Sequence, residues 1–258
     1  LATDGKQEKP WVLFVSMVAP HFPLIAPQEF YDLYDKLGLM PTKPRESPEH
    51  PWHHAMRNCQ IMDNFTSERT RVALASYYGL VTFIDDLIGK ILGAVEQNGL
   101  GDNTQIFYLS DHGDNIGERD LWGKSNFYEE SVGIPCIIKG PGIPVEKTVK
   151  TPVSLIDVCP TILKTAGITP EAKPGTSLVD LANAEDNLDR LVFSEYHAVG
   201  SATGAFMIRK GQWKLIYYVS MQPQLFNLAE DPEELCDLGA NPKHDGIRRQ
   251  LETELRSI

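Results

Sequence analysis

The chain reads Phe107-Tyr-Leu-Ser-Asp-His-Gly-Asp-Asn-Ile-Gly-Glu-Arg-Asp-Leu-Trp-Gly-Lys124 near its middle. Residues 105–109 are rich in apolar and aromatic side chains, which predicts a buried strand. Asp111 and His112 follow where that strand ends, and ligands bind at the carboxyl ends of strands in open α/β sheets. Successive strand residues point to opposite faces, so both side chains reach one site only if the backbone turns. Gly113 permits that turn.

The same stretch indicates a reaction on an anion. Lys124 lies thirteen residues after Asp111, which lets the intervening loop fold back toward the carboxylate and the imidazole. A carboxylate oxygen and an imidazole nitrogen are both ligands of divalent cations. A cation beside a lysine stabilises negative charge that develops on a bound substrate. We therefore expect a metal-assisted site for an anionic substrate.

An ordered set of short motifs accompanies these residues: Ser110-Asp-His-Gly, Gly117-Glu-Arg, Leu121-Trp-x-Lys, Phe127-Tyr-Glu-Glu and Ile134-Pro. This run closely resembles the second signature block of the type I sulfatases, which belong to the alkaline-phosphatase superfamily. It is most similar to the branch that contains choline-sulfatase and phosphonate monoester hydrolase. A bare Asp-His-Gly is weak evidence, whereas the ordered run as far as Pro135 is specific. The resemblance covers nearly all of this chain but only the later part of the family's enzyme.

The resemblance implies a site and a fold. It implies one divalent cation (Ca²⁺, Mn²⁺ or Mg²⁺) held by Asp111 and His112, with Lys124 balancing charge on the transferred group. It also implies an α/β fold in residues 1–170, with a mostly parallel sheet flanked by helices as in alkaline phosphatase. Residues 171–258 are expected to form a small C-terminal antiparallel α+β subdomain.

Two further histidines are candidates for substrate binding. His21 lies between prolines after an apolar run at 11–18, which has the length of a strand buried on both faces. A histidine in that place is more often structural, but sulfatases have a Pro-His-x-Pro element there. Its histidine contacts the sulfate and is a candidate proton donor to the leaving group, so the resemblance assigns that role to His21. His197 follows a strand-like run and is an equally good candidate for a structural role between the subdomains.

Histidines also cluster near Trp52, in a region without hydrophobic periodicity. Residues 41–52 are rich in Pro, Glu and His, which predicts a surface loop. His50, His53 and His54 are conceivable ligands of a metal, but we expect solvated side chains. Trp52 and His54 are minor candidates for substrate specificity.

Hydrophobic periodicity predicts the remaining elements. An amphipathic helix is expected at 68–98, with Gly99 ending it, and a second helix at 154–166. Glu129 and Glu130 resemble a general acid/base pair, but we expect them to anchor the loop or face solvent. Strands are expected at 134–139, 191–196, 204–209 and 213–219, before a terminal helix that ends at Leu255.

Composition excludes some classes of function. The 258 residues carry a formal net charge of −11, which argues against a general nucleic-acid surface. No apolar run approaches the ~18 residues of a membrane span. The four cysteines are far apart and do not have metal-site spacing. We expect buried free thiols at Cys136 and Cys159 and no disulfides, which favours the cytoplasm, although no targeting segment settles the compartment.

The nucleophile of the family is not encoded here. In sulfatases it is a formylglycine made from cysteine in a Cys-x-Pro-x-Arg context, and none of the four cysteines has that context. We expect the formylglycine, with two further metal carboxylates, on an upstream segment. The start at Leu1, without Met or a signal peptide, also favours a chain cut from a longer one. This chain alone is expected not to turn over esters, and to associate with the N-terminal portion or as a homo-oligomer.

The expected function is metal-dependent hydrolysis of small-molecule sulfate monoesters. One alternative is hydrolysis of phosphonate monoesters or phosphodiesters on the same scaffold. The other is an inactive sulfatase-like domain with a binding or structural role. A Cys-x-Pro-x-Arg motif upstream favours an enzyme, and a panel of substrates separates the two enzymatic alternatives.

Overall fold

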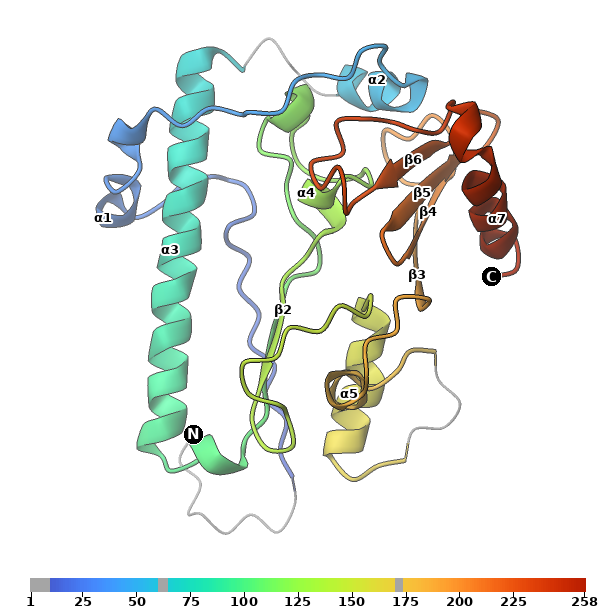
Figure 1. Cartoon of the computed structure of the whole chain (residues 1–258). Helices are drawn as coiled ribbons and strands as arrows, with labels where there is room; N and C mark the ends of the chain where they lie inside the picture. The colour runs from blue at the N-terminus through green and yellow to red at the C-terminus, as the bar shows by residue number, and fades with distance from the viewer. Residues whose placement is uncertain (1–9, 60–64, 170–173) are drawn as a thin grey trace.

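A computed structural model describes residues 10–59, 65–169 and 174–258 of the chain. Figure 1 shows the long helix α3 along one side, the strands β1 and β2 beside it, and a four-stranded sheet on the far side. The helices are α1 (Gln28–Tyr31), α2 (Pro51–Asn58), α3 (Ser67–Gln97), α4 (Glu129–Val132), α5 (Val158–Thr165), α6 (Leu178–Asn183) and α7 (Asp245–Leu255). The strands are β1 (Ile106–Leu109), β2 (Cys136–Lys139), β3 (Leu191–Tyr196), β4 (Ala205–Lys210), β5 (Trp213–Tyr218) and β6 (Gln224–Asn227). Short 3-10 helices lie at Asp35–Leu37, Gly101–Asn103, Glu118–Asp120, Leu155–Asp157 and Pro242–His244.

Helix α3 confirms the expected amphipathic helix to within one residue at each end. The hydroxyl of Thr66 accepts a hydrogen bond from the amide of Arg69 and caps the first turn. Gly99 follows the helix with φ +65°, a backbone conformation that glycine adopts without strain. Gly79 allows α1 to pack closely, because a Cβ there would lie 3.1 Å from the backbone of Phe30. Of the described helices, none is long and apolar enough to cross a membrane.

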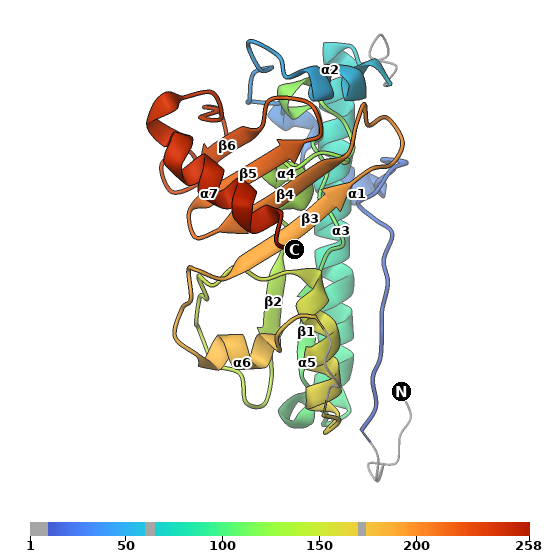
Figure 2. The same ribbon diagram turned by 90° about the vertical axis from the view of Figure 1, so that its right-hand side faces the viewer.

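The expected strand at 11–18 is wrong. Residues 10–18 form an extended segment that runs alongside α3 without a partner strand among the described residues (Figure 2). Its side chains are largely exposed, including Phe14 at 87%. An apolar run becomes a strand only when a neighbouring strand accepts its backbone hydrogen bonds. The run at 11–18 has strand composition, but it does not have that partner within the described residues.

The expected parallel sheet is likewise not formed among the residues that the structure describes. Strands β1 and β2 pair antiparallel, with Ile106 opposite Lys139 and Leu109 opposite Cys136. The strands β3-β4-β5-β6 form a second sheet in which every neighbouring pair is antiparallel. This second sheet is the antiparallel subdomain that the sequence predicts. The sequence did not predict β6. All four of its residues are buried, so it does not show the alternation of buried and exposed side chains that marks a half-buried strand.

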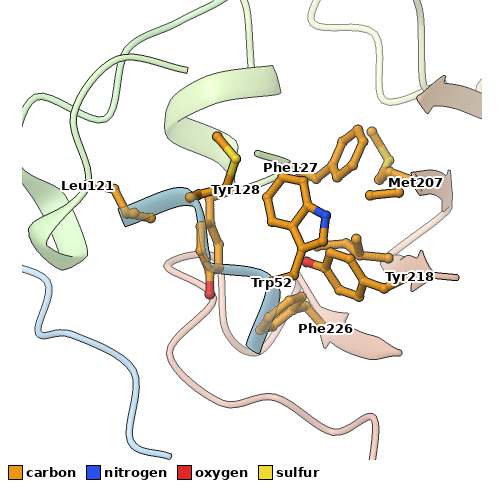
Figure 3. Packing of buried hydrophobic residues seen from close by; sticks show 10 residues of the cluster. Trp52, Leu121, Phe127, Tyr128, Met207, Tyr218 and Phe226 are labelled. Carbon is orange, nitrogen blue, oxygen red and sulfur yellow. The ribbon is translucent and has the colours of Figure 1, made fainter. Parts of the chain in front are cut away.

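One face of the four-stranded sheet packs on helix α2 and on the segment before α4. Figure 3 shows Trp52 of α2 among Phe127, Tyr128, Tyr218 and Phe226. The opposite face is covered by α7, and its buried residues are Ile208, Leu215, Leu225 and Leu251. The sheet therefore lies between two layers, and its core joins residues on both sides of the expected boundary at 170/171. That boundary itself stays a prediction.

The expected surface loop around Trp52 is wrong beyond residue 50. Trp52 and His53 are 0% and 1% exposed on α2, and His50 caps the helix by accepting a hydrogen bond from the Trp52 amide. Burial alone raises the pKa of Glu46, but hydrogen bonds from His53 and other partners lower it to about 2. Paired polar side chains can be buried, and hydrophobic periodicity does not detect them. Of the histidines there, only His54 is solvated as expected.

The expected burial of two thiols is also wrong, because Cys136 and Cys159 are exposed. Cys159 lies between half-buried Val158 and buried Pro160, whereas Cys136 lies between exposed Pro135 and Ile137, so neighbouring apolar residues in the sequence do not fix which side chain faces inward. All four cysteines are free, as expected.

A buried lysine joins the sheet to helix α4. Lys214 of β5 is 0% exposed, and its amine donates to Glu129 at 2.7 Å and to Glu234 at 2.6 Å. Glu130 accepts from Arg119 at 2.9 Å and also from Lys43. Both glutamates therefore anchor the loop, as the sequence led us to expect. Burial raises the pKa of Glu234 although the charge of Lys214 opposes that shift.

Replacing Lys214 by Ala should destabilise the fold strongly. The change leaves Glu234 buried without its cation, and breaking such a pair costs ~3–5 kcal/mol. Lys210→Ala is the matched control, because Lys210, the last residue of β4 in the same sheet, pairs with Glu254 at 2.9 Å where both side chains are partly exposed. The control should lose less than ~1 kcal/mol. Chemical denaturation measures both values, and equal losses would contradict the buried pairing.

Candidate functional site

Four of the five predicted site residues converge. The Lys124 amine lies 2.8 Å from Nε2 of His21, although 103 positions separate the two residues. The His21 ring centroid lies 6.0 Å from that of His112. Nε2 of His112 in turn lies 3.7 Å from Oδ2 of Asp111. His21, the neighbours Asp111 and His112, and Lys124 come from three separate segments of the chain. Together they form one polar cluster at the end of β1.

The hydrogen-bond partners of His21 indicate the tautomer of its neutral ring. A charged lysine amine is only a donor, so Lys124 donates to Nε2 of His21. Nδ1 of His21 lies 2.8 Å from the carbonyl oxygen of Phe22, which is only an acceptor. Nδ1 therefore carries the ring proton and Nε2 carries the lone pair. In this arrangement Lys124 is the donor and His21 the acceptor of the hydrogen bond between them.

The backbone turns after β1 as the sequence requires. The amide of Gly113 donates to the carbonyl of Ser131 at 2.8 Å, which brings the turn against α4. A Cβ at Gly113 would lie 2.0 Å from the carbonyl oxygen of Glu130, so only glycine fits there. The close approach directs the side chains of Asp111 and His112 to one side of the sheet edge, with their polar atoms 3.7 Å apart.

The donor atoms of His112 and Asp111 suit a cation. Nδ1 of His112 lies 2.8 Å from the Gly113 carbonyl oxygen, so that nitrogen is the donor and Nε2 is left with its lone pair. Orientation of a ligating imidazole by a backbone carbonyl is common in metal sites. The Asp111 side chain is 84% exposed, which leaves its oxygens accessible. Within the described residues no group of three or more His, Cys, Asp or Glu could hold a metal. Asp111 and His112 thus fit a divalent cation as two members of a larger ligand set.

His197 does not join the cluster by its contacts. Its ring packs against Phe206 at a centroid distance of 4.9 Å, and Nε2 lies 3.4 Å from the carboxylate of Glu195. Both partners belong to the four-stranded sheet. Trp52, a minor candidate for specificity, is buried in the core and cannot contact a substrate. His54 is exposed on α2 and pairs with Glu49 at 3.1 Å.

Sequence reasoning missed one residue at the site. The Phe22 ring lies 4.2 Å from the His21 ring and 5.9 Å from the Lys124 amine, measured to ring centroids. Phe22 is 62% exposed, so its ring forms an apolar wall beside both side chains. The sequence did contain a signal for this residue, because Phe22 is the variable position of the Pro-His-x-Pro element.

Comparison with known proteins identifies the family of this chain. Residues 1–168 match the family described as sulfatase, and residues 117–258 match N-sulphoglucosamine sulphohydrolase, C-terminal. Choline-sulfatase of Rhizobium meliloti (strain 1021) is 35% identical over 252 residues, which cover 93% of this chain and 48% of that protein. Arylsulfatase K of Mus musculus is 32% identical over 280 residues, with coverage of 97% and 50%. The chain spans about half the length of these curated relatives.

Solved structures confirm the fold class. The phosphonate monoester hydrolase of Silicibacter pomeroyi superimposes with a TM-score of 0.80 at 26% identity, over 92% of this chain and 53% of that one. The phosphonate monoester hydrolase of Agrobacterium radiobacter gives 0.79 at 23% identity, over 98% and 57%. The expected alkaline-phosphatase-like α/β class with a small antiparallel subdomain therefore holds. With a sulfatase match over residues 1–168 and a sulphohydrolase match over the rest, this chain belongs to the sulfatase family.

Proposed function

We propose that this chain contributes the second half of the active site of a hydrolase of sulfate monoesters. The observation that supports the proposal is the contact between His21 and Lys124 at 2.8 Å, beside Asp111 and His112. A lysine and a histidine that meet next to two metal-ligand side chains suit a tetrahedral anion, whose charge must be balanced and whose leaving oxygen must be protonated.

Each residue then has a distinct role. Asp111 and His112 hold a divalent cation, which when bound balances the charge on the nonbridging oxygens and activates an oxygen nucleophile. Lys124 donates hydrogen bonds to the transferred group through its amine. His21, when Nε2 is protonated, donates that proton to the leaving oxygen and returns to the neutral imidazole. The exposed ring of Phe22 excludes water from one side of that oxygen.

The nucleophile is proposed to come from outside this sequence. No cysteine here lies in a Cys-x-Pro-x-Arg context, and the curated relatives are about twice as long as the matched region. A formylglycine and further carboxylate ligands in the complete enzyme would supply the missing parts. On this proposal the 258 residues alone bind a cation weakly and do not turn over esters.

Hydrolysis of phosphonate monoesters is the second candidate function. It is favoured by the similarity to the Silicibacter pomeroyi phosphonate monoester hydrolase at a TM-score of 0.80. A panel that compares aryl sulfates with aryl phosphonates in the complete enzyme separates the two. Turnover of neither class would instead favour an inactive domain with a binding role.

Metal binding can be measured on this chain directly. We expect Mn²⁺ to bind weakly to the isolated chain, because Asp111 and His112 supply only part of a ligand set. Asp111→Ala should abolish the binding, as followed by isothermal titration calorimetry. His54→Ala is the control, because His54 is an exposed histidine outside the cluster. Mn²⁺ affinity that is unchanged in Asp111→Ala would remove the metal assignment.

Lys124→Ala should lower kcat/KM of the complete enzyme by at least the ~10²-fold typical of losing one preorganised electrostatic contact. Lys139→Ala is the matched control, because Lys139 is an exposed lysine on β2 whose nearest carboxylate, Glu96, is 3.9 Å away. Steady-state kinetics with an activated aryl sulfate measures both variants. Near-normal turnover without Lys124 would contradict its contact with the transferred group.

His21→Ala should affect esters with poor leaving groups more than those with good ones. A leaving oxygen of high pKa needs a proton in the transition state, whereas one of low pKa departs without it. The measurement is kcat/KM across aryl esters of graded leaving-group pKa, which should fall more steeply in the variant. Equal losses along the series would exclude His21 as the acid.

A further inference from the structure

The backbone around Lys124 departs from relaxed geometry on both sides. Gly123 before it has φ +70°, and Ser125 after it has φ +81°. Glycine adopts such values readily, but serine does so at a cost in free energy. Strained conformations persist when surrounding contacts determine them, and they concentrate at functional sites. The contacts that determine this one are therefore informative.

Two consecutive residues bind both polar groups of Gly123. Oδ1 of Asp114 accepts the Gly123 amide at 3.0 Å, and it also accepts the Ile116 amide at 2.8 Å. The Gly123 carbonyl accepts two hydrogen bonds from Asn115, from the backbone amide at 2.7 Å and from Nδ2 at 2.6 Å. Asp114 and Asn115 thus close residues 114–123 into a ring at the residue that precedes Lys124. We call this set of hydrogen bonds the Gly123 clasp.

The side chain of Asn115 is suboptimal for stability alone. It is 1% exposed, and among the described residues no donor reaches its Oδ1. A buried acceptor without a partner destabilises a fold, so a purely structural position would favour an apolar side chain. The side-chain amide of Asn115 does donate a hydrogen bond to the Gly123 carbonyl, in addition to the one from the Asn115 backbone. A buried polar atom without a hydrogen-bond partner is the kind of local cost in stability that is expected where a functional site needs a fixed geometry.

The clasp begins three residues after Asp111 and ends next to Lys124. The start of the ring is itself fixed, because the Gly113 amide is bonded to Ser131 of α4. A rigid ring therefore sets the distance between the Asp111–His112 pair and the lysine that faces His21. A free loop of this length would let the Lys124 amine move by several ångströms, and misplacement by 1 Å can cost ~10²-fold in rate.

We propose that Asp114 and Asn115 are positioning residues, which act on the reaction only through Lys124 by fixing the peptide of Gly123. The inference rests on the proposed function, since it needs Lys124 to contact the transferred group. It assigns a catalytic effect to two side chains that touch neither the cation nor the substrate.

A double-mutant cycle in the complete enzyme tests this inference. Asp114→Ala should lower kcat/KM by ~10- to 100-fold, mainly in kcat, because a misplaced lysine no longer meets the charge of the transition state. Asp114→Asn should recover most of the rate, because its Oδ1 still accepts from the Gly123 amide. On the Lys124→Ala background, Asp114→Ala should add less than ~2-fold, because a positioning residue has nothing left to position.

Two further variants make the test independent of folding. Asn115→Ala removes the side-chain donor to Gly123 together with the unpartnered Oδ1, and it should lower kcat while the thermal unfolding midpoint stays above the assay temperature. Asp120→Asn is the matched control: Asp120 is an exposed carboxylate of the same ring, and asparagine accepts its φ of +55°. The control should retain normal kinetics.

The outcomes separate this inference from the proposed function. Normal turnover in Lys124→Ala would remove the role of the lysine, and the inference with it. A large loss in Lys124→Ala with normal rates in Asp114→Ala and Asn115→Ala would overturn the inference alone. So would losses that multiply fully in the double variant, because the two residues would then act independently of Lys124.

Discussion

The pairing of buried Lys214 with Glu129 and Glu234 connects the C-terminal sheet to the predicted site. Glu234 also accepts a hydrogen bond from the backbone amide of Glu129, at the start of α4, at 2.7 Å. The same short helix accepts the amide of Gly113 through Ser131, at the turn that carries Asp111 and His112. The sheet is thus linked to Asp111 and His112 by a series of short contacts. Water is excluded from Lys214, so each charge depends on its partner.

A second set of charges holds the other side of the same loop. Arg119 is 2% exposed, donates to Glu130 at 2.9 Å and lies 4.1 Å above the centroid of the Tyr128 ring. Its backbone carbonyl accepts from Arg57 of α2 at 2.8 Å. Helix α2 is therefore bonded to the loop through Arg57. The loop that presents Lys124 is fixed by packing on both sides, while the lysine itself reaches out to His21.

These contacts explain why a region without periodicity is buried. The residues around Trp52 are mostly polar, and several of the buried polar groups pair with one another. His53 lies 2.9 Å from Glu46, and the hydroxyl of Tyr218 donates to Gln224 at 2.7 Å. Burial raises the pKa of the Tyr218 hydroxyl well above its ordinary value, so it stays neutral. A polar segment can enter a core when its hydrogen bonds are satisfied there.

The amino-acid sequence alone defined the elements whose signals are local. The periodicity of α3, the strand-like composition of β3 to β5 and the ordered motifs around Asp111 each lie within a short window, and the predicted helix and strands are present. The motifs also predicted the family and the residues that form the cluster. Only the tertiary structure established the burial of His50 and His53 and the antiparallel pairing of β1 with β2. It also showed that residues 11–18 have no partner strand within the part of the chain that it describes. Those features depend on partners far away in the chain, because burial and strand pairing are properties of two surfaces and a local pattern describes only one of them.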